Sequence, residues 1–171
     1  MKLEERRQIE ELMSPVCSLM VGDGVYCIDT RMIHEVLETW TLQRMPLAPG
    51  YIAGVISNRG AVLTTVSLRA LLGLNEITKS NVVLVLENGG EERFGLLVDA
   101  VGGVMSPSVE SVEANPSTLD ARSRVLFDGA HKLPEGLMVR LDAAKLCPSR
   151  LKEIEVFGSR GALGFGAGRG K

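Results

Sequence analysis

The stretch that decides the fold is residues 46–73, P-L-A-P-G-Y-I-A-G-V-I-S-N-R-G-A-V-L-T-T-V-S-L-R-A-L-L-G. Two runs of β-forming residues, 51–56 and 61–66, flank a polar turn whose glycine can take a positive φ. Residues 68–72 then form one amphipathic turn, followed by a glycine of the kind that favours a helix C-terminus. The pattern predicts a strand, a tight turn, a second strand and a short helix.

Arg59 is the only charged residue in the turn between these two strands. A charged side chain on a short turn is poorly placed to enter a core and well placed to meet another surface. We therefore consider two roles for Arg59. It contacts a partner protein, or it forms a structural salt bridge within the chain, for example with Glu35.

Similar strand-and-turn patterns recur along the chain. An Asp-Gly step separates the β-type runs 16–21 and 25–29, and Asn-Gly-Gly separates the runs 82–87 and 94–98. Residues 82–87 are almost continuously apolar, which is typical of a strand buried on both faces. Strands that recur roughly every 8–12 residues, with only brief helical turns, predict a mostly β fold of the barrel or sandwich type.

The last part of this β-rich region follows the same pattern. An Asp-Gly step at residues 128–129 predicts a turn, and residues 137–141 read as a late strand. Asp142 is a suitable N-cap for a short helix at residues 143–146.

The two ends of the chain differ from its middle. Residues 2–13 are mostly helix formers with a thin apolar stripe, so they form either a surface helix outside the core or a docking helix for a partner. The C-terminal end is basic and glycine-rich, which predicts a flexible tail. We divide the chain into an N-terminal charged helix at 1–14, a folded β domain at 15–148 and a tail at 149–171.

Composition argues against several classes of protein. The 171-residue chain has a formal net charge of −2, which gives no general attraction to nucleic acid or anionic membranes. Its three cysteines lack a Cys-x-x-Cys pair and fit buried thiols in a reducing compartment better than disulfides or a zinc site. No run approaches the ~20 apolar residues of a membrane span. We expect a soluble cytoplasmic protein that neither binds nucleic acid nor inserts into membranes.

Candidate catalytic groups are few. His34 lies in a β-type segment and His131 lies beside the Asp-Gly step, so we expect both at the surface or at a sheet edge. Cys17 and Cys27 have apolar neighbours, and a hydrolase that uses one of them is the least favoured alternative. Asp99 reads as a strand-end carboxylate that accepts a hydrogen bond from a turn. We predict no catalytic residue, no cofactor and no metal site.

Residues 54–74 resemble the CheW-like domain of bacterial chemotaxis coupling proteins, which carries a G-V-x-N-x-R-G turn, a strand ending P-V-x-D-L-R and a short helix. The turn here reads Ser57-Asn58, whereas asparagine usually comes first in the family. The likeness covers about residues 16–146. The other segments that agree, in the family's order, are residues 26–36, 44–49 and 94–101.

The resemblance implies two small five-stranded, SH3-like β-barrels packed against each other, without an active site. Proteins of this family bridge the cytoplasmic tip of a methyl-accepting chemoreceptor and a chemotaxis histidine kinase. The resemblance therefore implies a non-enzymatic adaptor in bacterial signal transduction. The alternative is a CheW-like scaffold or regulator in another kinase pathway, such as surface motility.

Four residues of this chain occupy the positions of the family's partner-binding surface. Two of them, Ile33 and Gly54, fit packing positions equally well. The four residues are Ile33, Glu35, Gly54 and Arg59.

Overall fold

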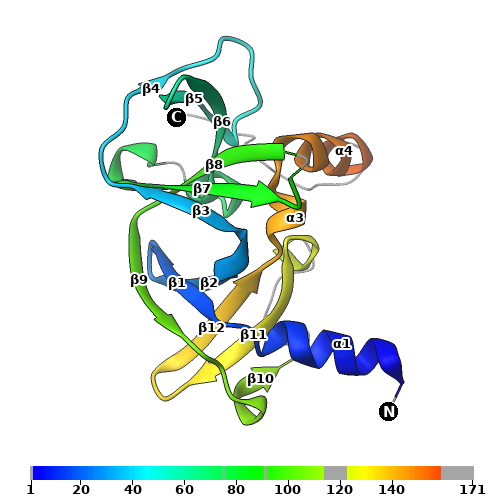
Figure 1. Cartoon of the computed structure of the whole chain (residues 1–171). Coiled ribbons are helices and arrows are strands. Elements are labelled where there is room, and N and C mark those ends of the chain that lie inside the picture. The colour runs from blue at the N-terminus through cyan, green and yellow to red at the C-terminus, as the bar shows by residue number, and fades with distance from the viewer. Residues whose placement is uncertain (1, 75, 91, 114–122, 159–171) are drawn as a thin grey trace.

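The computed structural model describes residues 2–74, 76–90, 92–113 and 123–158, with side chains described as far as residue 154. Two six-stranded sheets form two small barrel-like units, one above the other (Figure 1). Each sheet has five longer strands and one strand of two residues. The predicted pair of packed five-stranded barrels is confirmed, with one additional two-residue strand in each.

The upper unit in Figure 1 contains the stretch that decides the fold. Its strand order is β3-β7-β8-β6-β5-β4, and only β6 and β8 run parallel. The predicted hairpin is β5 and β6, and the apolar run is β7, in which residues 83–86 are fully buried. The strands are β3 (Ile33–Leu37), β4 (Leu42–Gln43), β5 (Ile52–Asn58), β6 (Ala61–Ser67), β7 (Val82–Asn88) and β8 (Glu92–Val98).

The lower unit is built from both ends of the β domain. Its strand order is β10-β11-β12-β2-β1-β9, and a parallel pairing of β2 with β12 joins the first hairpin to the last. The chain passes from the lower unit to the upper and back, so the lower unit is not continuous in sequence. The strands are β1 (Val16–Val21), β2 (Gly24–Asp29), β9 (Ala100–Met105), β10 (Val112–Glu113), β11 (Phe127–Leu133) and β12 (Gly136–Leu141).

Three clusters of buried apolar side chains stabilise this arrangement. Each unit has a small cluster of its own, while the largest cluster draws side chains from both sheets and from the C-terminal helices. This shared cluster makes the two units one domain, because separating them exposes its apolar surface to water. Representative members are Leu19 and Ile28 of the lower sheet, Leu84 and Leu96 of the upper sheet, and Leu146 and Leu151 of the helices.

The helices are short, from 4 to 11 residues, and α2, α3 and α4 contribute side chains to the shared cluster. Asp142 accepts a hydrogen bond from the Ala144 amide at 3.1 Å, which confirms the predicted N-cap. The α-helices are α1 (Leu3–Leu12), α2 (Leu68–Leu71), α3 (Ala143–Leu146) and α4 (Pro148–Gly158). The 3-10 turns are η1 (Thr30–Met32), η2 (Ile77–Lys79), η3 (Val109–Ser111) and η4 (Ser123–Val125).

The prediction of a flexible tail from residue 149 is wrong for residues 149–158, which belong to α4. Leu151 is fully buried in the shared cluster, and Ile154, one turn later, packs against it. Two apolar side chains at this spacing dock one face of the helix on the domain. The remaining part of the predicted tail lies outside the described residues.

Asp99 joins the two units, because it lies between β8 of the upper sheet and β9 of the lower sheet. Its carboxylate accepts hydrogen bonds from Arg69 Nε (2.6 Å) and Nη2 (2.7 Å) in α2. It also accepts one from the Gly22 amide in the β1–β2 turn at 2.9 Å, which confirms the predicted contact with a turn. Burial alone would raise the pKa of Asp99, but these hydrogen bonds and one from Ser80 hold it below its ordinary value.

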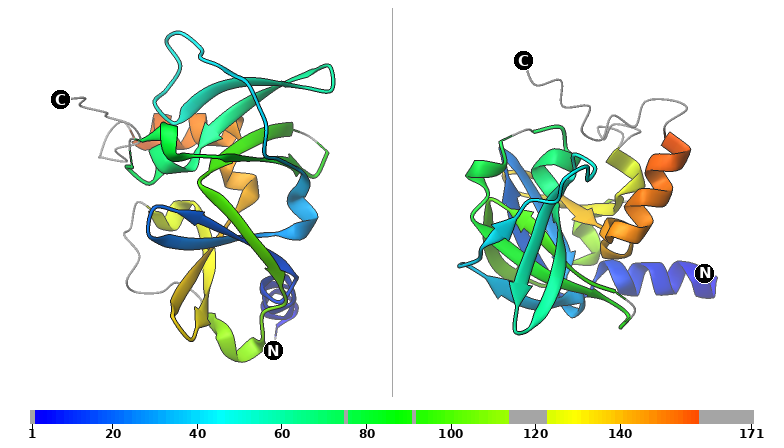
Figure 2. Two further views of the ribbon diagram at one scale, coloured as in Figure 1. Left: turned by 90° about the vertical axis from the view of Figure 1, so that its left-hand side faces the viewer. Right: turned by 90° about the horizontal axis from the view of Figure 1, so that it is seen from above.

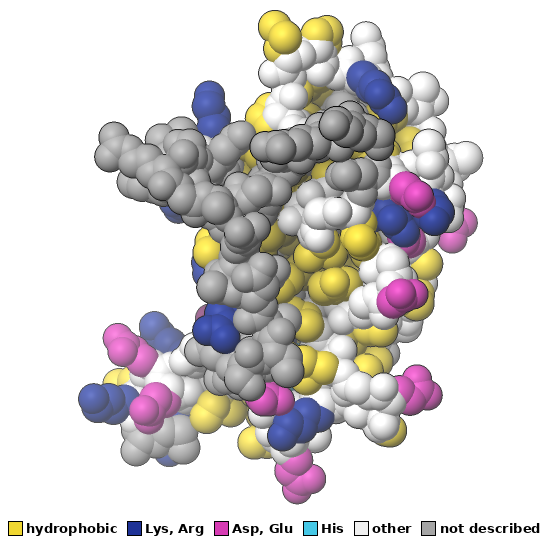
Figure 3. Space-filling model, turned by 180° about the vertical axis from the view of Figure 1, so that it is seen from behind, with side chains coloured by type: hydrophobic (Ala, Val, Ile, Leu, Met, Phe, Trp, Pro, Cys, Tyr) yellow, Lys and Arg dark blue, Asp and Glu magenta, His cyan; other side chains and the backbone are white. Residues whose placement is uncertain are grey.

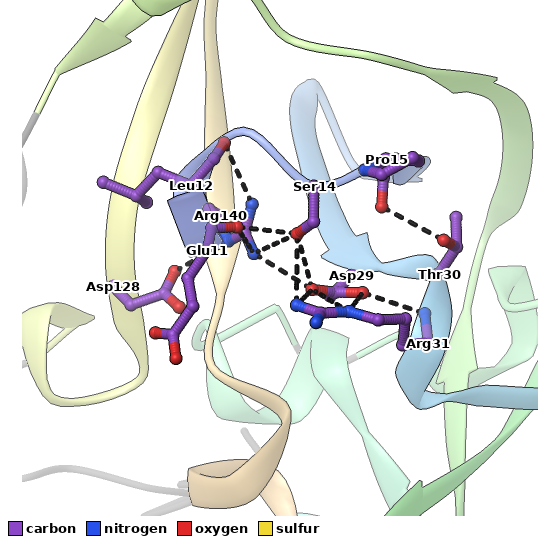
Figure 4. A network of polar contacts seen from close by, with 9 residues as sticks. All are labelled: Glu11, Leu12, Ser14, Pro15, Asp29, Thr30, Arg31, Asp128 and Arg140. Atoms are coloured by element: carbon purple, nitrogen blue, oxygen red, sulfur yellow. Dashed lines mark hydrogen bonds and ion pairs between the residues drawn. The ribbon is translucent and has the colours of Figure 1, made fainter. Parts of the chain in front are cut away.

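Helix α1 extends away from the body of the protein (Figures 1 and 2), and Leu12 is its one buried residue. Arg140 of β12, only 3% exposed, holds the C-terminal end of the helix (Figure 4). Its guanidinium donates to the carbonyl oxygens of Glu11 (2.7 Å) and Leu12 (3.3 Å). It also forms ion pairs with Asp29 (3.3 Å) and Asp128 (3.4 Å). The helix is a surface helix with a fixed attachment, and its role in docking a partner stays a prediction.

Two predictions about β11 are wrong. Asp128 and Gly129 do not form a turn; they lie in a bulge of β11, where the pairing register shifts between Phe127 and Gly129. His131 is therefore an interior strand residue, 1% exposed, and its ring nitrogens lack hydrogen-bond partners among the described residues. Burial, followed by the nearby charge of Arg140, lowers the pKa of His131, so the imidazole is neutral at pH 7.

We expect Asp128→Asn to stabilise the protein at neutral pH. Burial is the main factor that raises the pKa of Asp128 to about 6. The folded state thus binds this proton more tightly than the unfolded chain, whose aspartate pKa is about 3.9, and ionisation costs stability above pH 6. Because the side chain is 40% exposed, solvent screening limits the gain to about 1 kcal/mol.

Urea denaturation at two pH values checks this expectation. Asp128→Asn should unfold at higher urea concentration than the wild type at pH 7.5, and the two proteins should converge near pH 4. A variant that is less stable than the wild type at pH 7.5 would show that the Asp128 ion pair with Arg140 outweighs the burial of the carboxylate.

Candidate protein-binding site

The β5–β6 hairpin places Arg59 at its tip. Only Arg59 and Gly60 separate the two strands, and their φ angles are 49° and 79°. Positive φ at both central residues is the geometry of a type I′ turn, which asparagine or glycine adopts more easily than arginine. An arginine in this conformation costs about 1 kcal/mol, and such strain is frequently found at functional sites.

Glu35, Asn58 and Arg59 meet at this tip. Arg59 Nη2 donates to Glu35 Oε1 at 3.1 Å, and Asn58 Nδ2 donates to Glu35 Oε2 at 3.2 Å. Glu35 is on β3, four strand positions from β5 in the sheet order. In a flat sheet that separation would be about 19 Å, so this contact requires the upper sheet to curl into a barrel. The Arg59 side chain is nevertheless 80% exposed, and Glu35 is 23% exposed.

Both roles considered for Arg59 are therefore compatible with its geometry. The salt bridge with Glu35 exists, and an ion pair this exposed contributes little to stability, about 0–1 kcal/mol. Most of the guanidinium remains accessible to another molecule.

Ile33 is the first residue of β3, the strand that carries Glu35. It is half-buried, packs against the shared cluster, and lines a hollow of about 440 Å³ between the 31–34 segment and residues 87–90. His34, on the same strand, is 47% exposed, with its Nδ1 3.7 Å from a Glu87 carboxylate oxygen. His34 is thus at the surface, as predicted, and Ile33 combines packing with access to the hollow.

Gly54 is a buried residue of β5, whereas Arg59 and Gly60 at the hairpin tip are exposed. Its φ is 153°, and a Cβ atom added there would lie 2.3 Å from the Gln43 carbonyl oxygen of the neighbouring β4. A glycine is required at this position for backbone packing. Packing against β4 is sufficient to explain why residue 54 is a glycine. The contact of Gly54 with a partner protein therefore stays a prediction.

We expect Gly54→Ala to lower the free energy of unfolding by about 2 kcal/mol, because the new methyl group must displace the backbone of β4. Thermal and urea denaturation measure this loss. Gly103→Ala is a matched control, since a Cβ atom there meets no other atom within 4 Å. Unchanged stability of Gly54→Ala would contradict the packing role assigned to Gly54.

Apolar side chains are also exposed elsewhere on the molecule. On the face opposite that of Figure 1, hydrophobic side chains gather along the middle, and charged side chains lie mainly toward the edges (Figure 3). In the upper unit, Leu47 is fully exposed and Val62, on β6 close to the hairpin tip, is 71% exposed. Exposed apolar surface bordered by charges is typical of protein-binding surfaces.

The described residues offer little for chemistry. Burial raises the pKa of the Cys17 thiol and is the main reason that the pKa of Cys27 rises to about 12, so both are protonated and unreactive at neutral pH. No group of three or more His, Cys, Asp or Glu residues suited to a metal ion occurs in the part of the chain that the structure describes. Among those same residues, no helix is long and apolar enough to cross a membrane.

Two fused barrel-like units with a strained, charged hairpin tip define a β-barrel protein-binding module. Residues 15–150 match the family model described as "CheW-like domain". The chain belongs to the CheW-like domain family, and it is an adaptor of chemotaxis signalling. Helix α1 precedes the matched region.

Named relatives agree with this assignment. The chain is 30% identical over 135 residues to "Chemotaxis protein CheW" of Rhizobium meliloti (strain 1021), an alignment covering 78% of this chain and 86% of that protein. It is 25% identical over 130 residues to "Chemotaxis protein CheW" of Klebsiella aerogenes, covering 75% of this chain and 78% of that protein.

A solved structure supports the fold. The crystal structure of scaffolding protein TtCheW from Thermoanaerobacter tengcongensis superposes with a TM-score of 0.66 and 24% sequence identity. The match covers 75% of this chain and 88% of the other. The two proteins share the arrangement of paired barrels.

The structure brings together two of the four predicted site residues, Glu35 and Arg59, and adds Asn58 between them. Ile33 lies on the same strand as Glu35, where it packs against the shared cluster, and Gly54 is buried. One feature of the sequence pointed to Asn58: the family's usual asparagine position is occupied by Ser57 in this chain, and Asn58 is the next residue. Its partner could not be recognised until β3 was placed against the hairpin.

Proposed function

We propose that this chain is a non-enzymatic adaptor that couples the cytoplasmic tips of chemoreceptors to a chemotaxis histidine kinase. The observation that carries the proposal is the exposed Arg59 at a strained turn, paired with Glu35 within a family of chemotaxis adaptors. We propose Glu35, Arg59 and Ile33 as members of the binding surface. Gly54 supports this surface through the packing of β4 and β5.

The absence of a reactive group at the tip fits this role. An adaptor needs two surfaces that bind at the same time, and an ordinary interface of about 1,200–2,000 Å² is enough for each. The relatives named chemotaxis proteins favour chemotaxis over the alternative of a scaffold in surface motility.

Arg59→Asn tests the proposed surface. Asparagine adopts positive φ readily and forms a favoured Asn-Gly type I′ turn, so the hairpin should keep its shape and stability. The variant loses the charge, and we expect about tenfold weaker binding to the kinase or the receptor tip. Isothermal titration with each purified partner from the same organism measures this loss.

Ser57→Ala provides the matched control, because Ser57 is exposed in the same hairpin. It should bind both partners as the wild type does. If Arg59→Asn binds both partners as tightly as the wild type does, Arg59 is not part of the binding surface. If the wild type binds neither the kinase nor the receptor tip, the proposed function is refuted.

A further inference from the structure

Strand β9 is an open edge of the lower sheet. It pairs with β1 on one side, and among the described residues no strand pairs with its other side. Figures 1 and 2 show β9 on the outside of the molecule; in the left view of Figure 2 it is the green strand that crosses the face turned toward the viewer. An edge strand carries a row of backbone N–H and C=O groups directed away from its own sheet, and these groups can pair with a strand of another molecule.

Most of the features that block such an edge in other proteins are missing from β9. Residues 100–109 include no charged side chain, and Pro107 comes after the end of the strand. A bulge is present, because Gly102 and Gly103 together lie opposite Ser18 of β1. The bulge bends the strand but adds neither charge nor bulk to the edge.

Gly103 is the one glycine in the described strands that the fold itself does not require. Every other glycine of these strands either has a positive φ or would bring an added Cβ atom within 3.0 Å of another atom. Gly103 has neither property, since a Cβ atom there meets nothing within 4 Å. A glycine weakens the interior of a strand by about 0.5–1 kcal/mol relative to alanine, and a strand glycine often marks the close approach of another backbone.

Apolar side chains are exposed along the same edge. Val104 of β9 is 67% exposed, and Val109, which follows the strand, is 58% exposed. Met105 of β9 and Met20 of the neighbouring β1 are also partly exposed. Covering these side chains removes apolar surface from water, and residues 100–109 bring no charge that would need a partner in the interface.

The sequence of β9 favours a second copy of this chain as the molecule that covers the edge. A two-fold dimer brings the same patch of both copies together, so that residue i contacts residue j and j contacts i. The strand reads A-V-G-G-V-M, which is nearly the same in both directions. Antiparallel pairing about the two glycines places Val101 opposite Val104 and Gly102 opposite Gly103, and no like charges face each other.

We propose that the outer edge of β9 pairs antiparallel with β9 of a second copy of this chain, so that the lower sheets of the two copies form one continuous sheet. This surface is separate from the hairpin tip, because β9 belongs to the lower sheet and Arg59 lies in the hairpin of the upper sheet. The proposal goes beyond the adaptor function and does not depend on it. Each dimer carries two hairpin tips, one from each copy.

Sedimentation equilibrium of the full chain, without any partner protein, tests the proposal. With rising protein concentration, the mass of the wild type should increase from 18.4 kDa towards twice that value. Val104→Lys places a charge on the edge, and the two-fold symmetry brings that charge into the interface twice. We expect its association to be at least about tenfold weaker. Val62→Lys is the matched control, because Val62 is 71% exposed on the upper sheet, and it should associate as the wild type does.

Hydrogen exchange provides a readout that needs no variant. Raising the concentration of the wild type should slow the exchange of the β9 amides, while the amides of the β5–β6 hairpin exchange at an unchanged rate. This measurement decides the question if Val104→Lys fails to fold, which circular dichroism shows. Exchange of the β9 amides that is independent of concentration would refute the proposal.

Two further outcomes would overturn the proposal. The wild type may not exceed 18.4 kDa at any concentration, in which case the edge is left to a different protein. Alternatively, a dimer that is lost in Val62→Lys but retained in Val104→Lys would place the contact on the upper sheet. Neither outcome changes the test of the adaptor function, which is measured with the kinase and the receptor tip.

Discussion

Arg140→Met should lower the free energy of unfolding by about 3 kcal/mol and release helix α1 from the domain. Methionine keeps most of the apolar volume of the arginine but none of its donors. The Glu11 and Leu12 carbonyl oxygens then lose their hydrogen bonds, and the Asp29 and Asp128 carboxylates lose a buried cation. Leaving such groups without partners is among the costliest changes in a protein interior.

Two measurements check this prediction. Urea denaturation gives the loss of stability, and hydrogen exchange of the α1 amides shows the release of the helix, since a free 10-residue helix is barely stable in water. Arg150→Met is the control, because Arg150 pairs with Glu153 at the surface and both are 62% exposed. A loss below about 1 kcal/mol, with α1 amides still protected, would contradict the role assigned to Arg140.

Asp99→Asn should have a comparable effect, a loss of about 3 kcal/mol at pH 7. The substitution preserves size and leaves an acceptor for the Gly22 amide, but it leaves the Arg69 guanidinium, whose side chain is only 8% exposed, without a counter-charge. Because Asp99 is located between the two sheets, the loss weakens the attachment of one unit to the other.

The pH dependence gives this prediction a second readout. The pKa of Asp99 is lower in the folded state than in the unfolded chain, so its contribution is present above pH ~3.9 and is lost as the pH falls through the folded-state value. The stability gap between wild type and Asp99→Asn should therefore close in acid. Asp23→Asn, an exposed change in the adjacent turn, is the control. A gap that persists unchanged below pH 3 would contradict the ionic nature of this contact.

Local signals in the sequence were sufficient to predict the hairpins and caps. The Asp-Gly step at 23–24, the apolar run of β7 and the Asp142 cap each depend on neighbours within a few residues. The turn at Arg59 likewise depends only on residues close to it in the sequence. The family resemblance supplied the pairing of the barrels, which no local pattern could give.

Long-range contacts account for most of what was missed. Arg140 interrupts an apolar strand and so carried a signal of burial with a partner, but its partners Glu11 and Leu12 are more than 120 residues away in sequence. The Asp-Gly step at 128–129 forms a bulge, because β11 continues through it to pair with β12. Likewise, α4 forms where Leu151 reaches the shared cluster, a contact that the sequence of the tail does not reveal.

The candidate site was predicted in part for the same reason. The sequence analysis named Arg59 and Glu35 as a possible salt bridge, and in the structure Arg59 Nη2 lies 3.1 Å from Glu35 Oε1. Asn58 was not predicted as a site residue. Its contact with Glu35 depends on the curl of the upper sheet, which brings β3 against the hairpin tip.

Co-sedimentation tests the central claim most directly. Vesicles that display the receptor's cytoplasmic tip are mixed with the purified histidine kinase, with and without this chain, and are then pelleted. The proposed adaptor predicts that the kinase pellets with the vesicles only when the chain is present, and less so with Arg59→Asn. Equal recovery of the kinase in the presence and absence of the chain would contradict it.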